Sequence, residues 1–588
     1  MKSYLLRTSA LWVRGLILAL LSVSLVAFFT QYAYAVTFAK TYGGTGYDHA
    51  FSVQQTSDGG YIVAGVTYSF GAGNEDIILI KTDANGNIIW AKTYGGTDND
   101  RVYSVQQTSD GGYIVAGHTN SFGAGGRDIF LIKTDASGNV QWAKTYGGSA
   151  DEYAFSVQQT SDGGYIVAGH TLSFGAGNWD IFLIKINASG NLQWARTYGG
   201  AGDDRAHSVQ QTSDGGYIVA GWTTSFGAGF EDILLIKTDA NGNVQWAKTY
   251  GGSVHDLTFS VQQTSDGGYI VAGYTESFGA GWDDIFLMKT DANGNLQWAK
   301  TYGGASGDWA YSVQQTSDGG YIVAGATLSF GAGLHDIFLI KTDAFGNVEW
   351  AKTYGGVSSE VARSVQQTSD GGYIVADRTN SFGAGSEDIF LIKTDANGNV
   401  QWAKTYGGAN NDRAYSVQQT SDGGYIVASR TNSFGAGSWD VFLVKTDGNG
   451  NIGSCGIVRN ASPTVTTPSP TVTAFSPSVS SLSLTPESPS LTTTSPTLTV
   501  YEVCPLSFDD NVGISESCQI ASGLITPYKG GIKITKSGEF EVKVYNVSGV
   551  MVKSIKGKDE VKLELSRGVY FVEVVSGGKV IREKVVIR

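Results

Sequence analysis

The chain has 588 residues, of which 41% are hydrophobic and only 16% are charged, so it can bury a large core and is not disordered throughout. Residues 36 to 456 carry 41 acidic and 23 basic side chains, a net charge of −18. Such a surface repels polyphosphate and argues against nucleic acid as a partner. The length implies either several domains or a repeat architecture.

The N-terminus has the pattern of an export signal. Basic residues end at Arg14, an apolar run extends from Leu16 to Phe29, and Ala33-Tyr34-Ala35 supplies a small-x-small cleavage site. The apolar run is short for a membrane span. We therefore expect residues 1–35 to be a cleaved signal peptide and the mature protein to be secreted or held at the cell surface. The alternative is an uncleaved signal anchor.

A repeat of 52 residues follows the export signal. Between its copies recur SVQQTSDGGYIVAG, then T-x-SFGAG, then an Asp followed by an apolar run. No segment shows helical periodicity. The motif AKTYGG, once ARTYGG, begins each unit at Ala39, Ala91, Ala143, Ala195, Ala247, Ala299, Ala351 and Ala403.

Each unit predicts four short antiparallel strands. The turns between them are rich in Asp, Asn and Gly, which close tight hairpins. The continuously apolar strand cores indicate sheets covered on both faces. Four strands with a period near 50 residues are typical of a β-propeller. In the first unit the predicted strands are Phe51 to Gln55, Tyr61 to Thr67, Asp76 to Thr82 and Asn87 to Tyr94.

The two ends of the repeat array complement each other. Phe38 to Tyr42 form a lone fourth strand, and the last unit ends without one. Pairing residues 38 to 42 with residues 440 to 446 would give eight complete blades with no unpaired end. All nine prolines lie beyond residue 462, as expected when the preceding residues form hydrogen-bonded strands. The predicted fold class is therefore all-β: an eight-bladed propeller over residues 36–456, closed by its N-terminal strand.

The repeat motifs WAKTxGG and DGGYxVxG resemble the bacterial and archaeal β-propeller repeats grouped as SBBP-like. The resemblance covers residues 36 to 454. It implies the propeller fold and leaves the function open, because propellers host many activities.

Differences between the repeats are concentrated in the loops that follow the second and fourth strands. Since strand direction alternates, both loops lie on one face of the disc, which we call the variable face. A ring of differing side chains around one mouth of a propeller is the predicted ligand site. The alternative is that the sequences of these loops vary without a function because the fold constrains them only weakly. The candidate ligand-binding residues are Trp179, Trp222, Trp282, Trp309, Trp439, His118, His170, Arg378 and Arg430.

Two acidic positions recur in every unit. Strict repetition favours a structural role, in which each carboxylate accepts loop N–H groups; cation sites are the alternative. One position lies just before the first strand (Asp48, Asp100, Glu152, Asp204, Asp256, Asp308, Glu360 and Asp412), and the other begins the third (Asp76, Asp128, Asp180, Asp232, Asp284, Asp336, Asp388 and Asp440).

Known catalytic motifs are missing from the sequence: it has no GxSxG, HExxH or P-loop, and the repeats contain no cysteine. His118 and His170 hold equivalent positions in adjacent units and are the one pair worth testing as ligands. We therefore expect no catalytic residue, no metal and no cofactor. An enzyme acting on an extracellular polymer and a structural surface-layer component remain the alternatives.

A Ser/Thr/Pro-rich tract occupies residues 457–504. Its composition is typical of an extended stalk or linker, and its alternating Thr and Val could equally make short strands. Cys455 and Cys504 bracket the tract and Cys518 follows it. An exported chain permits a disulfide among them, with three pairings open.

Residues 505–588 alternate apolar and polar in short runs, which predicts a small Ig-like β-sandwich. The segments VKVYNVSGVMVKSI and LSRGVYFVEVVSGGKVIREKVVIR resemble the C-terminal sorting domain of type IX secretion cargo. That resemblance implies contact with secretion machinery and attachment to, or release from, the cell surface. The whole sequence thus favours an exported, monomeric, non-enzymatic propeller that binds a protein or glycan partner through its variable face.

Overall fold

The computed structural model describes residues 36–453, 457–462, 464–466, 471–474, 478–481, 499–502, 525–528, 531–546, 551–564, 568–576 and 579–587. The predicted signal peptide and the three cysteines lie outside these residues. The chain divides into two compact units, residues 1–510 and 511–588. The described residues are all-β, and they include no helix long and apolar enough to cross a bilayer.

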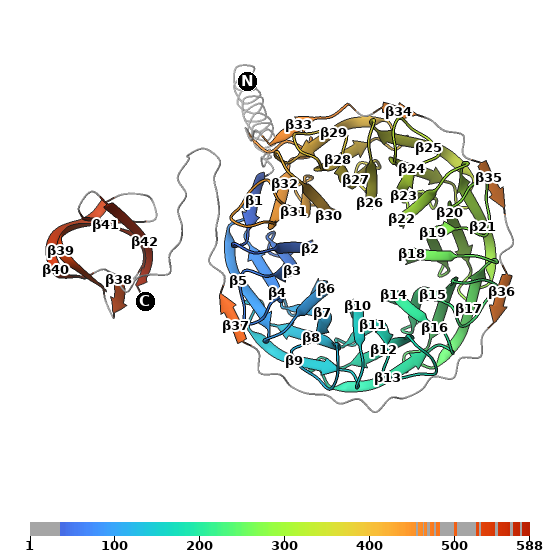
Figure 1. Ribbon diagram of the computed structural model, residues 1–588, viewed down its shortest axis with the longest axis horizontal. Coiled ribbons are helices and arrows are strands. Elements are labelled where there is room, and N and C mark those ends of the chain that lie inside the picture. Colours follow the sequence, from blue (N-terminus) through green and yellow to red (C-terminus); the bar gives the residue numbers. More distant parts are fainter. Residues whose placement is uncertain are drawn as a thin grey trace, which may run out of the picture. The chain divides into compact units, whose positions relative to one another are not determined.

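Eight four-stranded antiparallel sheets form the blades of a propeller, arranged as a ring in Figure 1. Blades 1 to 4 comprise β2 (Asp48–Gln55), β3 (Tyr61–Thr67), β4 (Asp76–Thr82), β5 (Ile88–Gly95); β6 (Asp100–Gln107), β7 (Tyr113–Thr119), β8 (Asp128–Thr134), β9 (Val140–Tyr146); β10 (Glu152–Gln159), β11 (Tyr165–Thr171), β12 (Asp180–Ile186), β13 (Leu192–Tyr198); and β14 (Asp204–Gln211), β15 (Tyr217–Thr223), β16 (Asp232–Thr238), β17 (Val244–Gly251). Blades 5 to 8 comprise β18 (Asp256–Gln263), β19 (Tyr269–Thr275), β20 (Asp284–Thr290), β21 (Leu296–Gly303); β22 (Asp308–Gln315), β23 (Tyr321–Thr327), β24 (Asp336–Thr342), β25 (Val348–Gly355); β26 (Glu360–Gln367), β27 (Tyr373–Thr379), β28 (Asp388–Thr394), β29 (Val400–Tyr406); and β30 (Asp412–Gln419), β31 (Tyr425–Thr431), β32 (Asp440–Thr446), β1 (Phe38–Tyr42).

The predicted strands are confirmed, with the first strand of each blade longer than expected. In blade 1 the first strand begins at Asp48, three residues before the predicted Phe51. A bulge between Ala50 and Ser52 interrupts the register, and the pairing with the second strand continues on both sides of it. The second and third strands are buried along their whole length. Sheets stacked face to face around a ring bury both faces of their central strands, which explains the apolar runs.

Repeated side chains fasten each blade to the next. Trp90 donates its indole N–H to the carbonyl of Ala136, 3.0 Å away in the third turn of blade 2, and its ring packs against Tyr113. Tyr94 donates its hydroxyl to the carbonyl of Gly138 at 2.8 Å. The motif QWAKTYGG is therefore a set of contacts between blades.

An ion pair between a buried lysine and a partly exposed aspartate braces the turn between the first two strands in every blade. In blade 1 the ammonium of Lys81, on the third strand, lies 3.0 Å from the carboxylate of Asp58 in the TSDGG turn. Lys81 also donates to the carbonyl of Thr82 at 2.8 Å. Each of the eight blades has this pair, and it accounts for the strict repetition of both residues.

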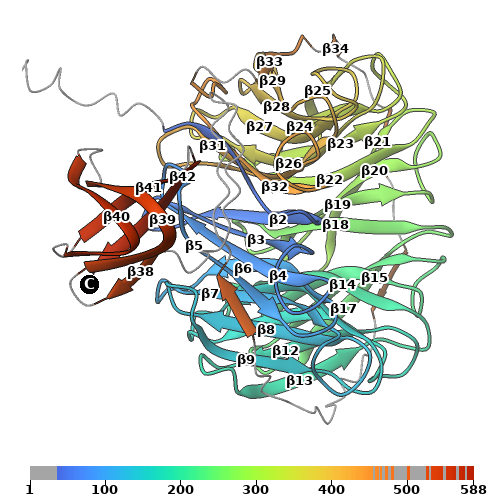
Figure 2. The same cartoon turned by 60° about the vertical axis from the view of Figure 1, so that its left-hand side comes forward.

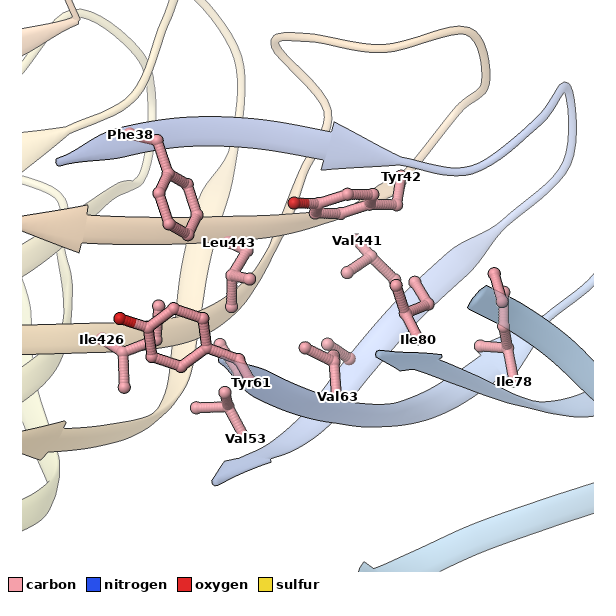
Figure 3. Packing of buried hydrophobic residues seen from close by; sticks show 13 residues of the cluster. Phe38, Tyr42, Val53, Tyr61, Val63, Ile78, Ile80, Ile426, Val441 and Leu443 are labelled. Atoms are coloured by element: carbon pink, nitrogen blue, oxygen red, sulfur yellow. The ribbon is translucent and has the colours of Figure 1, made fainter. Parts of the chain in front are cut away.

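The N-terminal strand closes the ring as predicted. β1 pairs with β32 from Phe38↔Lys445 to Tyr42↔Val441. Phe38 takes the place that Trp occupies in other blades, 6.0 Å from Tyr61 of blade 1, and Tyr42 donates to the carbonyl of Gly86 at 2.7 Å. Figure 3 shows both rings in the hydrophobic cluster shared by blades 8 and 1.

The Ser/Thr/Pro-rich tract adds a fifth strand to five blades, as Figure 1 shows along the outside of the ring. Figure 2 brings β37, on blade 1, to the front. These five segments of the tract belong to the propeller unit and pair with its blades. For them the prediction of short strands is confirmed, and the prediction of an extended stalk is wrong. They are β33 (Val458–Asn460) on β29, β34 (Thr464–Thr466) on β25, β35 (Thr471–Ala474) on β21, β36 (Ser478–Ser481) on β17 and β37 (Thr499–Glu502) on β5.

A seven-residue period sets this outer register. Successive valines, seven residues apart, pair with the Tyr of TYGG on blades 7, 6, 5 and 4 in turn. The passage from blade 4 to blade 1 spans three such periods. The pairs are Val458↔Tyr406, Val465↔Tyr354, Val472↔Tyr302, Val479↔Tyr250 and Val500↔Tyr94.

The C-terminal unit is one five-stranded sheet bent around its own core. β40 pairs with β39 along both of its halves, with a register shift between Lys536 and Glu539. On its other edge β39 pairs first with β38 and then with β41. The buried core consists of Ile534, Phe540, Val542, Val544, Val561, Leu563, Val572 and Val574. The strands are β38 (Ile525–Tyr528), β39 (Gly531–Asn546), β40 (Met551–Glu564), β41 (Gly568–Ser576) and β42 (Lys579–Ile587).

Candidate functional site

Four of the positions that differ between repeats lie at one end of each blade, where the antiparallel register gathers them. In blade 1 they are His49 and Phe51 on β2, Val66 on β3 and Glu75 just before β4. His49 pairs directly with Val66, and Phe51 is the bulged residue. Their equivalents in all eight blades surround the mouth of the variable face.

Many of these side chains contact one another across the seams between blades. Arg101 of blade 2 donates to Glu75 of blade 1 at 2.7 Å. Across the next seam, the guanidinium of Arg127 hydrogen-bonds the Tyr153 hydroxyl and lies 5.5 Å from that ring. Some of the residues that differ between repeats therefore make contacts between blades, and these contacts differ from seam to seam.

The two candidate histidines lie in an aromatic cluster of blades 2 to 4. Tyr153 lies between them, with ring centroids 4.9 Å from His118 and 5.3 Å from His170, and Trp179 lies 4.7 Å from His170. Burial lowers the pKa of both histidines to about 3, so they are neutral at physiological pH. The part of the chain that is described contains no cluster of three His, Cys, Asp or Glu able to hold a metal.

Trp222 and Trp179 belong to the same cluster. The guanidinium of Arg205 lies 5.2 Å from the ring of each, between blades 3 and 4. Trp222 also donates its indole N–H to His207 at 3.1 Å. The structure thus brings four of the predicted residues, His118, His170, Trp179 and Trp222, into one continuous patch.

Arg430 and Trp439 form a second group, where blades 8 and 1 meet. The Arg430 guanidinium lies 4.3 Å from the Trp439 ring and 3.2 Å from His49 Nδ1. Burial, together with the charges of Arg430 and Arg101, lowers the pKa of His49 to about 4. This group is cationic through arginine, not through histidine.

Trp309 and Arg378 line a cavity of about 540 Å³ between blades 6 and 7. His335 also lines it, with its ring 5.7 Å from that of Trp309. Arg363 and Tyr311 complete one wall. This cavity lies on the variable face and contains two of the predicted residues.

Trp282 stands apart from the other predicted residues. It is 83% exposed at the tip of the blade 5 loop, and the equivalent Phe230 and Leu334 of blades 4 and 6 are 66% and 63% exposed. Val357, 81% exposed, follows in the loop before blade 7. We call these four side chains the apolar rim. The position of Trp282 is small or polar in the remaining blades, where it holds Asn74, Gly126, Asn178, Ser386 and Ser438.

The repeated acids accept hydrogen bonds from their own loops, as the structural interpretation of the sequence predicts. Asp48 accepts from the N–H of Gly44 at 2.8 Å and from the Ser69 hydroxyl at 2.6 Å. Asp76 accepts from the N–H of Gly73 at 2.9 Å. Burial is the main cause that raises the pKa of both carboxyls, that of Asp76 to about 6.

Several residues of the site were not among the predicted ones. Arg363 and Tyr311 occupy the bulged position of β26 and β22, and Asp377 replaces a glycine found in blades 1 to 6. The signal was available, because both positions differ between units. The bulge that turns the first position toward the mouth has no sequence signature of its own, since it depends on the pairing of two strands.

Three family models match parts of the chain. "Secretion system C-terminal sorting domain" matches residues 526–588, "Holdfast attachment protein D" residues 253–457, and "Domain of unknown function (DUF5122) beta-propeller" residues 160–192. With the fold, they define the class: a β-propeller repeat protein with a C-terminal sorting domain of the type IX kind. The sorting domain indicates that the chain is exported.

Individual relatives are distant. The chain is 26% identical over 204 residues to "Regulatory protein FlaEY" of Caulobacter vibrioides, covering 30% of this chain and 21% of that protein. It thus spans about a fifth of that relative's length. Solved structures include "Crystal structure of the eukaryotic initiation factor" (9% identity, TM-score 0.35, 71% of this chain and 99% of the other) and an endo-1,5-alpha-L-arabinanase from Thermotoga petrophila (11%, 0.22, 69% and 99%). At these TM-scores neither similarity carries an inference.

Proposed function

We propose that this chain is an exported, non-enzymatic β-propeller, attached to the cell surface or released from it, that binds a protein or glycan partner through its variable face. The observation that carries the proposal is the apolar rim. Large apolar side chains that face solvent on three consecutive blades have no part in the core, and such patches mark interaction sites. The match to a holdfast attachment protein over residues 253–457 supports a role at the surface.

The remainder of the variable face supports the same function. Trp, Tyr, His and Arg line the mouth, and aromatic rings with a polar edge bind sugars and apolar groups of proteins. These side chains are held by rigid strands and by each other across the seams, so a ligand meets a surface already formed.

The test uses the purified secreted chain against glycan arrays and intact cell surfaces. Changing Phe230 and Trp282 to alanine should weaken binding about tenfold or more, because exposed aromatic anchors dominate such contacts. Phe345→Ala is the matched control: this ring is 71% exposed in a turn of the opposite face, so binding should not change. Equal binding by all three proteins would contradict the proposed face, and shortened polymer after incubation would contradict a non-enzymatic role.

A further inference from the structure

The cavity between blades 6 and 7 is lined by two arginines, Arg363 and Arg378. Blade 7 carries arginine at two of its four variable positions, Arg363 and Arg378, and blade 8 carries Arg413 and Arg430 at two of its own. All lysines of residues 36 to 456 lie at repeated positions of the strands, outside these variable positions. Cationic side chains at this end of the mouth are therefore guanidinium groups, which bind carboxylates with two parallel hydrogen bonds.

Two acids, Asp377 and Glu387, lie near these arginines but do not bind all of their N–H groups. Glu387 is bound by Arg413, with a contact of 2.7 Å to Nη2, and lies 3.5 Å from Arg378 Nε. That Nε is buried and makes no hydrogen bond within the described residues. Arg363, 48% exposed, lies 3.4 Å from Asp377. The Nε atoms of Arg205 and Arg430 are also buried without a hydrogen bond, so this feature is not particular to the cavity. Arg363 and Arg378 both line the cavity, where their guanidinium groups can meet an anionic ligand.

The same cavity offers an aromatic wall. Trp309 and Tyr311 line it beside the two arginines, with Ser359 and Asn380 as further polar groups. An aromatic ring next to a guanidinium fits a ligand that has an apolar ring face and an anionic substituent. The apolar face of a pyranose with a carboxylate on the ring has this combination.

We propose that the cavity binds an acidic sugar, with the carboxylate of a uronic acid against Arg363 and Arg378 and the sugar ring stacked on Trp309. This rests on the proposed function and names its ligand class at one place on the variable face. The partner is then an anionic polysaccharide, met by the basic side of the mouth although the propeller as a whole is acidic.

Asp377 makes the binding depend on pH. It is 1% exposed, and burial raises its pKa to about 7. Below that pH it loses its charge and no longer competes with the ligand for Arg363, so affinity for an anion should rise as the pH falls from 8 to 6. The charged and titratable groups that face Asp377 are Arg363, Arg378, Arg413, Glu387 and Tyr311.

The experiment measures binding of trigalacturonate, and of the same trisaccharide with its carboxyls methyl-esterified, to the full secreted chain by calorimetry. Trigalacturonate should bind more tightly at pH 6 than at pH 8, and the ester should bind at least about tenfold more weakly. Arg363→Gln and Arg378→Gln should each weaken binding of the acid about tenfold, and Arg196→Gln, an arginine of an outer strand, should leave it unchanged.

Asp377→Asn separates the pH effect from folding. This nearly isosteric variant should bind trigalacturonate at pH 8 as tightly as the native chain does at pH 6, with little pH dependence. Equal affinity for acid and ester, or no binding of the acid, would overturn the acidic-sugar proposal. The proposed function would then still stand or fall on the Phe230 and Trp282 variants, which lie outside this cavity.

Discussion

Single repeated residues connect neighbouring blades of this protein. Tyr94 is buried, and its hydroxyl donates across the seam to the carbonyl of Gly138. The first glycine of the YGG motif is required for lack of space: a Cβ on Gly95 would lie 2.1 Å from Asp76 Oδ1 and 2.6 Å from Asp100 Oδ2 of the next blade. Repetition at these positions reflects contacts between units, which a single blade could not reveal.

Tyr94→Phe should destabilise the propeller by about 1 kcal/mol, because it removes one buried hydrogen bond and leaves the Gly138 carbonyl without that donor. Chemical denaturation measures the change in the free energy of unfolding. Tyr47→Phe, at a ring that is 49% exposed on the variable face, is the control and should be neutral. Equal stability of the two variants would show that the seam hydrogen bond contributes nothing.

The fifth strands change what the blades present to solvent. An exposed outer strand offers unpaired N–H and C=O groups to other chains, and proteins commonly cover such edges. Segments of the Ser/Thr/Pro-rich tract cover blades 7, 6, 5, 4 and 1 in a register of seven residues. Among the described strands, the outer strands β1, β9 and β13 of blades 8, 2 and 3 have no such partner.

Changing both Val472 and Thr473 to proline should uncover the edge of blade 5. Alternate N–H groups of a strand point toward its neighbour, so two consecutive prolines remove one bond of the pairing with β21. Hydrogen exchange should then become faster in β21.

β9 serves as the internal reference, because its exchange should be the same in both proteins. Unchanged exchange in β21 would mean that the fifth strand does not protect blade 5 in solution.

Buried aspartates in every part of the ring make the stability of the propeller depend on pH. Burial raises the pKa of the third-strand acids, to about 6 for Asp76, Asp128, Asp284 and Asp388 and to about 7 for Asp440. The folded state therefore binds protons that the unfolded chain, with a carboxyl pKa near 3.8, does not bind. Buried histidines such as His118 and His170 have the opposite effect, but the shifted carboxyls are more numerous.

The melting temperature should therefore rise as the pH is lowered from about 8 to about 5. It should fall again below about pH 4, where the turn acids that pair with lysine, such as Asp110 with a pKa lowered to about 2, lose their charge. Calorimetry across this range measures the profile.

A variant with His118 and His170 changed to Gln should show a steeper rise toward pH 5, because it lacks two groups that resist protonation. A melting temperature that falls steadily from pH 8 to pH 5 would contradict the role of the buried carboxyls.

The repeats in the sequence were sufficient to predict the propeller, its eight blades and its closure by residues 38 to 42. Hairpin turns and apolar strands are determined by residues close together in the chain, and the constant period shows how often the blade is repeated. The sequence also predicted which face would vary. It did not predict that Arg363 and Asp377 meet beside Arg378, or that valines of the tract would pair with tyrosines of five blades. These contacts join residues that are distant in the chain, and only the curvature of the ring and the register of its strands bring them together.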